Sequence, residues 1–456
     1  MLKKIFVWIL AAMLALSNVG CTSVPQPTME ELLAEVNAEH AAVEQADDFS
    51  QYLRKPLGET TFKIMQTFPF SDEEFDPQKV LTLEQATEDV DYLFTVFHDT
   101  YPLYDYFGGE EAFTAAREKI LADCAAAQPL TGEVLVESMI AHLNFVEDRH
   151  FSINKQTTQP SDYPFLFREI AFVKTENGYR TEDGRNVERV DGWDNLDELF
   201  RRSLDKNGRI VYYPVILEEF KNLSMGGMST RICSQQLTVH YQGGESQILT
   251  AEPFKPYWEN QEGNIVIEKD AQFPVIRMKN FTGQGERNVR EFMNDLSDTT
   301  PLILDMRSNS GGYNDARSSF LNHLFGRDLP CNFLKVNTIT GEQLSKEADE
   351  FVENDRLVIL LVGKMSASQA ELFTDALHNL ENVLIIGENT AGCAMTGMID
   401  FQLPNSLAKV ALNTMGSMHV FPQGDYFEEG RGLLPDIWVP AGEAEELAVK
   451  LIENLK

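Results

Sequence analysis

One short stretch constrains the fold more than any other part of this chain. Residues 301–312 read Pro-Leu-Ile-Leu-Asp-Met-Arg-Ser-Asn-Ser-Gly-Gly, so an apolar run is followed at once by a polar turn and a glycine pair. This order is typical of a buried strand that delivers a loop to an active site. From Phe273 onward such strands alternate with helical stretches, which predicts parallel β-α-β units with functional loops at the carboxyl ends of the strands. In chain order, we expect strand 275–278, helix 286–296, strand 302–306, helix 314–324, strand 357–362, helix 369–380 and strand 383–386.

The preceding residues show two other patterns. Capping-box pairs, Thr28 with Glu31 and Thr82 with Gln85, predict helices that begin after each threonine, the first one reaching residue 46. Apolar residues at helical spacing predict a helical unit within residues 80–145, whose first stripe consists of Leu83, Ala86, Val90, Leu93 and Phe97.

Residues 152–261 contain short β-type runs, such as 210–214 and 236–241, separated by turn residues. Within them, the turn at 184–192 and a helical pattern at 196–204 resemble the strand, turn and helix of a PDZ-like domain. A hairpin turn that ends in Asp-Gly is the alternative, because it is common in any β-rich domain.

The first residues predict export. Residues 1–4 read Met-Leu-Lys-Lys, and the uncharged apolar run 5–16 that follows is typical of a signal peptide, because it is too short to span a bilayer. Cys21 stands where a bacterial lipoprotein is cleaved and acylated, although Asn18 replaces the leucine that this pattern prefers. An ordinary signal peptide cleaved near Gly20 is the alternative. We expect a chain held by lipid on Cys21 at the outer, extracytoplasmic face of the membrane.

Composition excludes several classes of function. The chain has 38 basic and 71 acidic residues and a net charge of −33, so it repels phosphate backbones and we expect no nucleic-acid partner. Besides Cys21, the four cysteines are too few and too scattered for a disulfide framework or a CxxC zinc site. The sequence contains neither an HExxH motif nor a phosphate loop, so we expect no catalytic metal and no cofactor.

A second polar turn, Met-Ser-Ala-Ser-Gln-Ala-Glu at 365–371, follows the expected strand 357–362 and opens a helix. Unpaired N–H groups and the positive end of the helix dipole therefore lie beside Ser368, a setting that favours an oxyanion. A serine before a helix is often only an N-cap, and this alternative stays open for Ser366 and Ser368.

Together, the loop at 305–312 and the Ser-x-x-Glu motif at 368–371 resemble the C-terminal processing and tricorn-core serine peptidases. The resemblance implies a crotonase-like α/β catalytic core in which Ser368 is the nucleophile. It also implies that the N–H groups of Gln369 and of Gly311 or Gly312 form the oxyanion hole.

A serine hydroxyl needs a base, and the family has two solutions. The bacterial C-terminal processing enzymes use a lysine 25 residues after the serine, but that position here is Cys393. The tricorn-type branch uses the histidine of an Asp-x-His motif, which residues 148–150 supply. The resemblance therefore implies that His150 is the base. Taken alone, a histidine just beyond a helix end could equally interact with the helix dipole.

The same branch has an orienting glutamate before a Gly-x-x-Pro-Asp turn near the C-terminus. Glu429 aligns best with that position, and the adjacent Glu428 stays open as an alternative. The polar residues Asp305, Arg307, Asn309 and Asp436 are expected to hold the loops rather than to take part in the chemistry.

We thus expect an α+β multidomain protein whose parts are a signal peptide at 1–20, a lipid-anchored tether and helix at 21–79, an N-terminal helical unit at 80–151, a β-rich middle domain at 152–264 and an α/β serine peptidase core at 265–456. The expected function is a lipid-anchored serine endopeptidase that hydrolyses peptides or unfolded proteins through an acyl-enzyme on Ser368. The alternative is a catalytically silent relative that binds peptides or small apolar ligands. The joint presence of Ser368, His150 and Glu429 argues against that alternative.

Overall fold

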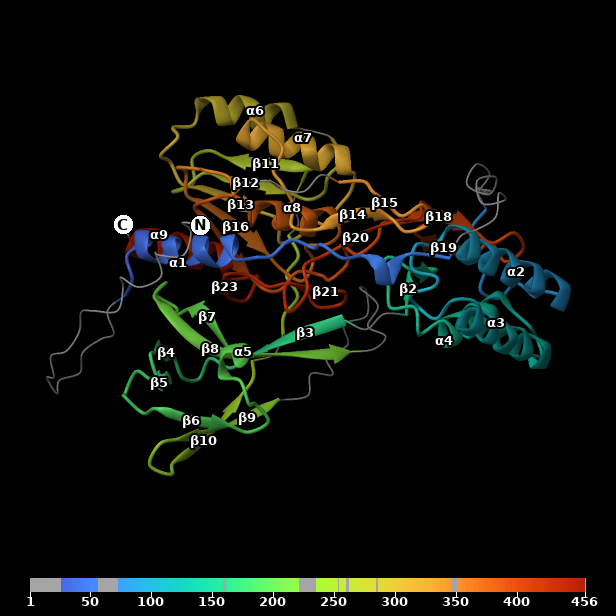
Figure 1. Cartoon of the computed structure of the whole chain (residues 1–456), viewed down its shortest axis with the longest axis horizontal. Coiled ribbons are helices and arrows are strands. Elements are labelled where there is room, and N and C mark those ends of the chain that lie inside the picture. Colours follow the sequence, from blue (N-terminus) through green and yellow to red (C-terminus); the bar gives the residue numbers. More distant parts are fainter. Residues whose placement is uncertain are drawn as a thin grey trace, which may run out of the picture.

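The computed structural model describes residues 26–55, 73–158, 161–220, 235–252, 254–259, 262–283, 286–345 and 351–455. The predicted signal peptide, the predicted lipidation residue Cys21 and Cys233 lie outside these residues. A bundle of helices lies at one end of the molecule, two small sheets lie at another, and an α/β part joins them (Figure 1). Among the residues that the structure describes, no helix is both long and apolar enough to cross a bilayer.

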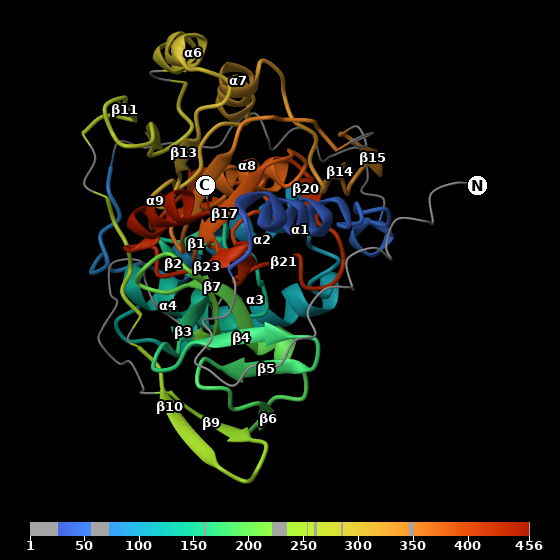
Figure 2. The ribbon, with the colours of Figure 1, turned by 90° about the vertical axis from the view of Figure 1, so that its left-hand side faces the viewer.

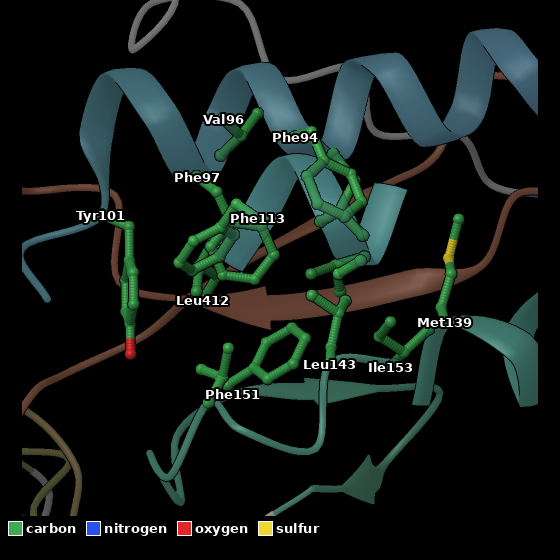
Figure 3. Packing of buried hydrophobic residues seen from close by; sticks show 14 of the residues in the cluster. Phe94, Val96, Phe97, Tyr101, Phe113, Met139, Leu143, Phe151, Ile153 and Leu412 are labelled. Carbon is green, nitrogen blue, oxygen red and sulfur yellow. The ribbon is translucent and has the colours of Figure 1, made fainter. Parts of the chain in front are cut away.

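The helical unit contains α2 (Leu83–Thr100), α3 (Gly109–Ala126) and α4 (Gly132–His142). The capping box of Thr82 with Gln85 is present, which confirms the predicted start of α2. Aromatic rings of Phe97, Phe113 and Phe151 pack against one another in the core of this unit (Figure 3). The apolar stripe of α2 is buried except for Leu83, which is 49% exposed. Periodicity identifies the apolar face of a helix but not how far along that face the core extends.

The β-rich part forms two sheets. The larger one has the order β3-β8-β4-β5, with β7 also paired to β8, and the smaller one has the order β10-β9-β6. Their strands are β3 (Ser161–Leu166), β4 (Phe172–Thr175), β5 (Gly178–Thr181), β6 (Val187–Val190), β7 (Phe200–Leu204), β8 (Ile210–Phe220), β9 (Gln236–Tyr241) and β10 (Ser246–Thr250).

The predicted helix at 196–204 is wrong beyond its first turn. A single turn, α5 (Leu196–Leu199), is followed directly by β7, which pairs antiparallel with β8 along its whole length. The pairing buries Phe200 and Leu204, so contacts with a distant strand override the local helical spacing. This removes most of the helix on which the likeness to a PDZ-like domain depended.

The α/β part is built on a six-stranded sheet with the order β11-β12-β13-β16-β17-β23. The five strands from β12 to β23 run parallel, as the alternating pattern predicts, and β11 is antiparallel at the edge. The strands are β11 (Ile265–Glu268), β12 (Val275–Met278), β13 (Leu302–Asp305), β16 (Val358–Val362), β17 (Val383–Gly387) and β23 (Ile437–Trp438).

Helices cover both faces of this sheet. Side chains of α6 (Glu286–Asp295), α7 (Asn314–Phe325) and α8 (Gln369–Leu377) pack on one face, and those of α1 (Met29–Ala41) and α9 (Ala444–Asn454) pack on the other. Helices α1 and α9 lie side by side in both views (Figures 1 and 2), and the Met29 N–H donates to the Leu455 carbonyl oxygen at 3.2 Å. Helix α1 ends at Ala41 rather than at the predicted Ala46, whose N–H donates to the Asn332 carbonyl oxygen.

Strands from the last part of the chain complete the helical unit, although no local sequence pattern predicts this pairing. Strands β18 (Ile399–Gln402) and β19 (Lys409–Leu412) continue through β1 (Ser152–Ile153) and β2 (Gln156–Thr157) in one antiparallel sheet. Other short strands are β14 (Leu334–Asn337), β15 (Glu342–Gln343), β20 (Ser417–Val420), β21 (Phe427–Glu428) and β22 (Gly432–Leu433). The β1–β19 pairing brings the loop before β1 close to the loops that follow β17.

A buried ionic network fixes the carboxyl end of β13. The Asp305 carboxylate is 3% exposed and accepts hydrogen bonds from Arg307 Nε at 2.9 Å and Nη2 at 2.6 Å, and it also pairs with Arg277. Glu445 on α9 neutralises the second positive charge. The side chains of Asp305 and Arg307 therefore attach the start of the glycine loop to the rest of the core.

We expect Asp305→Ala to lower the free energy of unfolding by about 3–5 kcal/mol, because it removes the buried carboxylate that pairs with both guanidinium groups and leaves Glu445 as the remaining carboxylate that contacts both. Burial is the largest single influence and opposes ionisation of Asp305, but the hydrogen bonds and charge of Arg307, together with the charge of Arg277, outweigh it and hold its pKa below the usual range. The stabilisation is therefore present above the unfolded-state pKa of about 3.9 and is lost as the pH falls below it. Urea denaturation at neutral and acidic pH measures both effects. The exposed Asp298→Ala is the control, and an equal loss there would contradict the prediction.

Candidate active site

Ser368 occupies the sharp turn between β16 and α8. Its backbone angles are φ +56° and ψ −117°, a conformation that a residue other than glycine adopts only at a cost of about 1–3 kcal/mol. The turn is held against the glycine loop, because the Ala367 N–H donates to the Asn309 carbonyl oxygen at 3.0 Å. Since β13 and β16 are neighbours in the sheet, both predicted loops meet at one edge.

The hydroxyl of Ser368 meets the imidazole of His150. Nε2 of His150 lies 3.2 Å from Oγ of Ser368, although the two residues are 218 positions apart in the chain. His150 is held by an Asx turn in which its own N–H donates to Oδ1 of Asp148 at 2.9 Å. Asp148 in turn accepts hydrogen bonds from the hydroxyl groups of Tyr101 and Thr396, so the whole Asp-x-His segment is fixed by buried partners.

Burial sets the protonation state of this imidazole. Desolvation lowers the pKa of His150 below its ordinary value, and the opposing charge of Asp148 only partly offsets this. The ring is therefore neutral near pH 7. With its proton on Nδ1, the lone pair of Nε2 can accept the hydroxyl proton of Ser368.

The two serines of the turn have different surroundings. Oγ of Ser366 is buried, donates to the Met306 carbonyl oxygen at 2.8 Å and accepts from the Gly363 N–H at 3.0 Å, which is a structural role. The Glu371 carboxylate accepts from the Ser368 N–H at 2.9 Å, and the Glu371 N–H donates to the Ser368 carbonyl oxygen at 2.9 Å. The helix start is thus stabilised through the backbone of Ser368, while its hydroxyl faces His150.

The glycine loop supplies backbone N–H groups next to Ser368. The Gly311 N–H donates to Oδ1 of Asn309 at 2.9 Å, so this predicted oxyanion donor is already engaged. Across the described parts of the chain, no hydrogen-bond acceptor is found for the N–H groups of Gly312 and Gln369. Of the three predicted donors, these two are available to a ligand.

Replacing Gly311 by alanine should lower kcat/KM by on the order of 10²-fold, the effect of misplacing reacting groups by about an ångström. The added Cβ would lie 2.7 Å from Cβ of Ser368 and 2.8 Å from the Ala367 carbonyl oxygen, at a φ of +95°. Gly178→Ala is the matched control, since its φ is +107° but nothing lies within 4 Å of the added atom. An unchanged kcat/KM in Gly311→Ala would show that this close approach does not position the serine.

Two further side chains lie close to the imidazole of His150. Sγ of Cys393 is 3.5 Å from Nδ1, so the residue at the position of the missing lysine contacts the candidate base. A carboxylate oxygen of Glu429 lies within 4.8 Å of this sulfur and of a ring nitrogen of His150. The neighbouring Glu428 has an exposed side chain, which pairs with Arg431 at 3.8 Å.

Backbone amides hold Glu429 in place. Its carboxylate accepts from the N–H groups of Arg149 at 3.0 Å and Met395 at 3.1 Å, which joins the loop of His150 to the loop of Cys393. Burial, with the nearby Asp148 carboxylate, raises the pKa of Glu429 to about 8. The side chain is therefore largely protonated at neutral pH.

Lys364 is the nearest lysine in sequence to Ser368, but its ammonium group has other partners. Nζ donates to the carbonyl oxygens of Thr390, Ala391, Gly430 and Arg431 at 2.9–3.3 Å. Burial lowers its pKa to about 7. Four acceptors occupy all three hydrogens of the ammonium group, which gives Lys364 a role in joining the loops around the site.

Among the residues that the structure describes, folding creates two clusters of metal-ligating side chains where the sequence shows no metal motif. One consists of His40, His378 and Asp436, and the other of His150, Cys393 and Glu429. In the first, Nε2 of His40 already pairs with Oδ1 of Asp436 at 2.8 Å, which joins α1 to the Pro-Asp turn. The contact of Cys393 with His150 is the feature that sequence reasoning missed, although the 25-residue spacing from Ser368 pointed to that position.

Part of the chain is similar in sequence to known proteins. Residues 273–439 match Peptidase family S41, a family of serine-type peptidases. The tail-specific protease of Haemophilus influenzae is 27% identical over 154 residues, which are 33% of this chain and 22% of that protein. The carboxy-terminal processing protease CtpA of Bacillus subtilis is 27% identical over 126 residues, which are 27% of each protein. The chain thus aligns with about a quarter of the length of these relatives.

Solved structures are similar at lower identity. Mature CPAF matches at 15% identity with a TM-score of 0.44, covering 82% of this chain and 98% of that one. The tricorn protease matches at 13% identity with a TM-score of 0.39, covering 82% of this chain and 37% of that one.

Proposed function

We propose that this chain, whose residues 273–439 match Peptidase family S41, is a serine endopeptidase with Ser368 as nucleophile and His150 as general base. One observation supports this more than any other: Nε2 of a buried His150 lies 3.2 Å from Oγ of Ser368, at a strained turn that opens a helix. We include in the proposal the crotonase-like nature of the α/β core and the predicted domain boundaries. Peptides or unfolded proteins are the proposed substrates.

In this mechanism, Nε2 of His150 takes the proton of Ser368 while Oγ attacks the carbonyl carbon of the peptide bond. The N–H groups of Gly312 and Gln369 stabilise the oxyanion, each contributing about 2.7–4 kcal/mol. His150 then passes the proton to the leaving amine, which leaves an acyl-enzyme on Ser368. A water molecule, deprotonated by the same imidazole, hydrolyses the ester and regenerates the serine.

The third group of the triad is neutral in this proposal. Glu429, with its raised pKa, keeps its position through backbone amides and limits the movement of the imidazole. We therefore propose Glu429 as an orienting residue and expect a smaller loss of rate from Glu429→Gln than from changes at Ser368 or His150.

A fluorophosphonate probe tests the proposal directly. The full chain is incubated with the probe, and the modified residue is mapped by mass spectrometry, alongside cleavage of an unfolded protein such as casein. We expect a single modified residue, Ser368. Modification at Ser366 would identify that residue as the nucleophile instead. Absence of both labelling and cleavage would favour the silent, peptide-binding alternative.

We also propose that the protein is exported and anchored through lipid on Cys21. Replacement of Cys21 by serine should move the protein from the membrane fraction to the soluble fraction, because no acyl chains can then be attached. Detergent-phase partitioning of the expressed full chain measures this. Cys124→Ser is the control, since that thiol is buried in α3, and unchanged partitioning of Cys21→Ser would refute the anchor.

A further inference from the structure

The second of the two metal-ligating clusters lies at the proposed base. Nδ1 of His150 and Sγ of Cys393 are 3.5 Å apart, and a carboxylate oxygen of Glu429 completes a group of three within 4.8 Å. Imidazole, thiolate and carboxylate are the three side-chain ligands that zinc takes in proteins. They come from three separate loops, after α4, after β17 and at β21, so only the folded chain assembles them.

The spacing fits a tetrahedral ion. Zinc lies about 2.0–2.1 Å from a histidine nitrogen and about 2.3 Å from a cysteine sulfur, so at a tetrahedral angle the two ligand atoms are about 3.5 Å apart. The distance between Nδ1 of His150 and Sγ of Cys393 has this value without any movement. A small shift of the Glu429 carboxylate would bring in the third ligand and leave the fourth position to water.

The surroundings favour a cation. The nearby carboxylates of Asp148 and Glu371 act on the Cys393 thiol through their charges, opposed by Arg149. Glu429 also lines a cavity of about 460 Å³, which has four further carboxylates in its wall, from Asp48, Glu147, Asp162 and Glu428. Cys393 and Glu429 are only half-buried. A divalent cation is therefore attracted to the cavity, whose wall includes one of the three ligands, Glu429.

We propose that His150, Cys393 and Glu429 bind a zinc-class divalent cation and that the bound ion reversibly inhibits the peptidase. The inhibition, unlike the binding, rests on the proposed function. Coordination uses the lone pair of Nδ1, so the single proton of the neutral imidazole moves to Nε2. Nε2 then has no lone pair with which to accept the proton of Ser368. The Cys393 thiol and the Glu429 carboxyl group each release a proton to solvent as they become thiolate and carboxylate ligands.

Cobalt(II) tests the site independently of catalysis. Titration of the full chain, as wild type and as Ser368→Ala, should produce the near-ultraviolet charge-transfer absorption of a thiolate–cobalt bond, and zinc should displace it. Cys393→Ser should lose the band. Cys331→Ser, a half-buried thiol elsewhere, should keep it, and the cluster of His40, His378 and Asp436 cannot produce it because it has no sulfur. Absence of the band in wild type, or its persistence in Cys393→Ser, would overturn the site.

Zinc inhibition tests the consequence. Zinc should slow both hydrolysis and fluorophosphonate labelling of the wild type, a chelator should restore them, and Cys393→Ser should need at least about tenfold more zinc for the same effect. Glu429→Gln should also weaken inhibition by zinc, so the conclusion does not depend on the correct folding of one variant alone. If cobalt binds while labelling is unaffected by zinc, the inhibitory role is wrong. If wild type shows neither hydrolysis nor labelling without metal, the proposed function fails, and the cobalt band still decides the site.

Discussion

Replacing Ser368 by alanine should reduce peptide hydrolysis by on the order of 10⁴–10⁶-fold, the largest effect expected from any single change. The change removes the only atom that can form the acyl-enzyme and leaves Gly312, Gln369 and His150 in place. The residual rate should come from oxyanion stabilisation and binding alone. Steady-state kinetics on an unfolded protein or a fluorogenic peptide, together with probe labelling, measure the loss.

Ser310→Ala is the matched control for this experiment, because Ser310 is an exposed serine of the glycine loop, close to the site in sequence and structure. It should retain activity near that of the wild type. Both variants should unfold at denaturant concentrations close to the wild-type value, since neither removes a buried apolar group. Comparable activity in Ser368→Ala and the wild type would remove Ser368 from the mechanism.

His150→Ala should cost nearly as much as Ser368→Ala, and the double variant should lose little more than either single one. The reason is that a nucleophile and its base act as one unit, so their effects do not multiply. Comparison of the kcat/KM values of the two single variants and the double variant tests this. Independent losses that multiply would mean that the 3.2 Å contact does not transfer a proton during the reaction.

The pH profile gives a second test of His150. The imidazole can act as a base only when neutral, so activity should fall as the pH falls through its pKa. Because burial lowers that pKa from an ordinary value of 6.5, activity should persist below pH 6.5. A lysine base would behave differently, since the pKa of Lys364 is about 7. If the His150→Ala variant keeps activity, and that activity falls on acidification near pH 7, Lys364 would be identified as the base.

The contact of Cys393 with His150 changes how the absence of the usual lysine is understood. The chain does not merely lack that residue; it places a thiol 3.5 Å from the imidazole of His150, the proposed base. Burial raises the pKa of this thiol well above its usual range, so it stays protonated in the resting site. A neutral thiol leaves the proposed base uncharged, and only a metal ion would convert it to a thiolate.

Local patterns in the sequence determined the parts of this protein that depend on neighbouring residues. The capping boxes at Thr28 and Thr82 and the strand and helix order from β12 to β17 follow from side-chain spacing and from polar groups at helix starts, which act over a few residues. For the same reason, the two loops that meet at the edge of the sheet were predictable, since neighbouring parallel strands end together.

The tertiary structure alone decided what depends on residues far apart in the chain. It turned most of the predicted helix at 196–204 into β7, because pairing with β8 outweighs a weak local preference. Pairing of β1 with β19 set the loop of His150 against the loop of Cys393, and burial among carboxylates then set the protonation of His150, Cys393 and Glu429. Distances and desolvation are properties of the packed chain, so no local pattern could reveal that the residue replacing the lysine touches the proposed base.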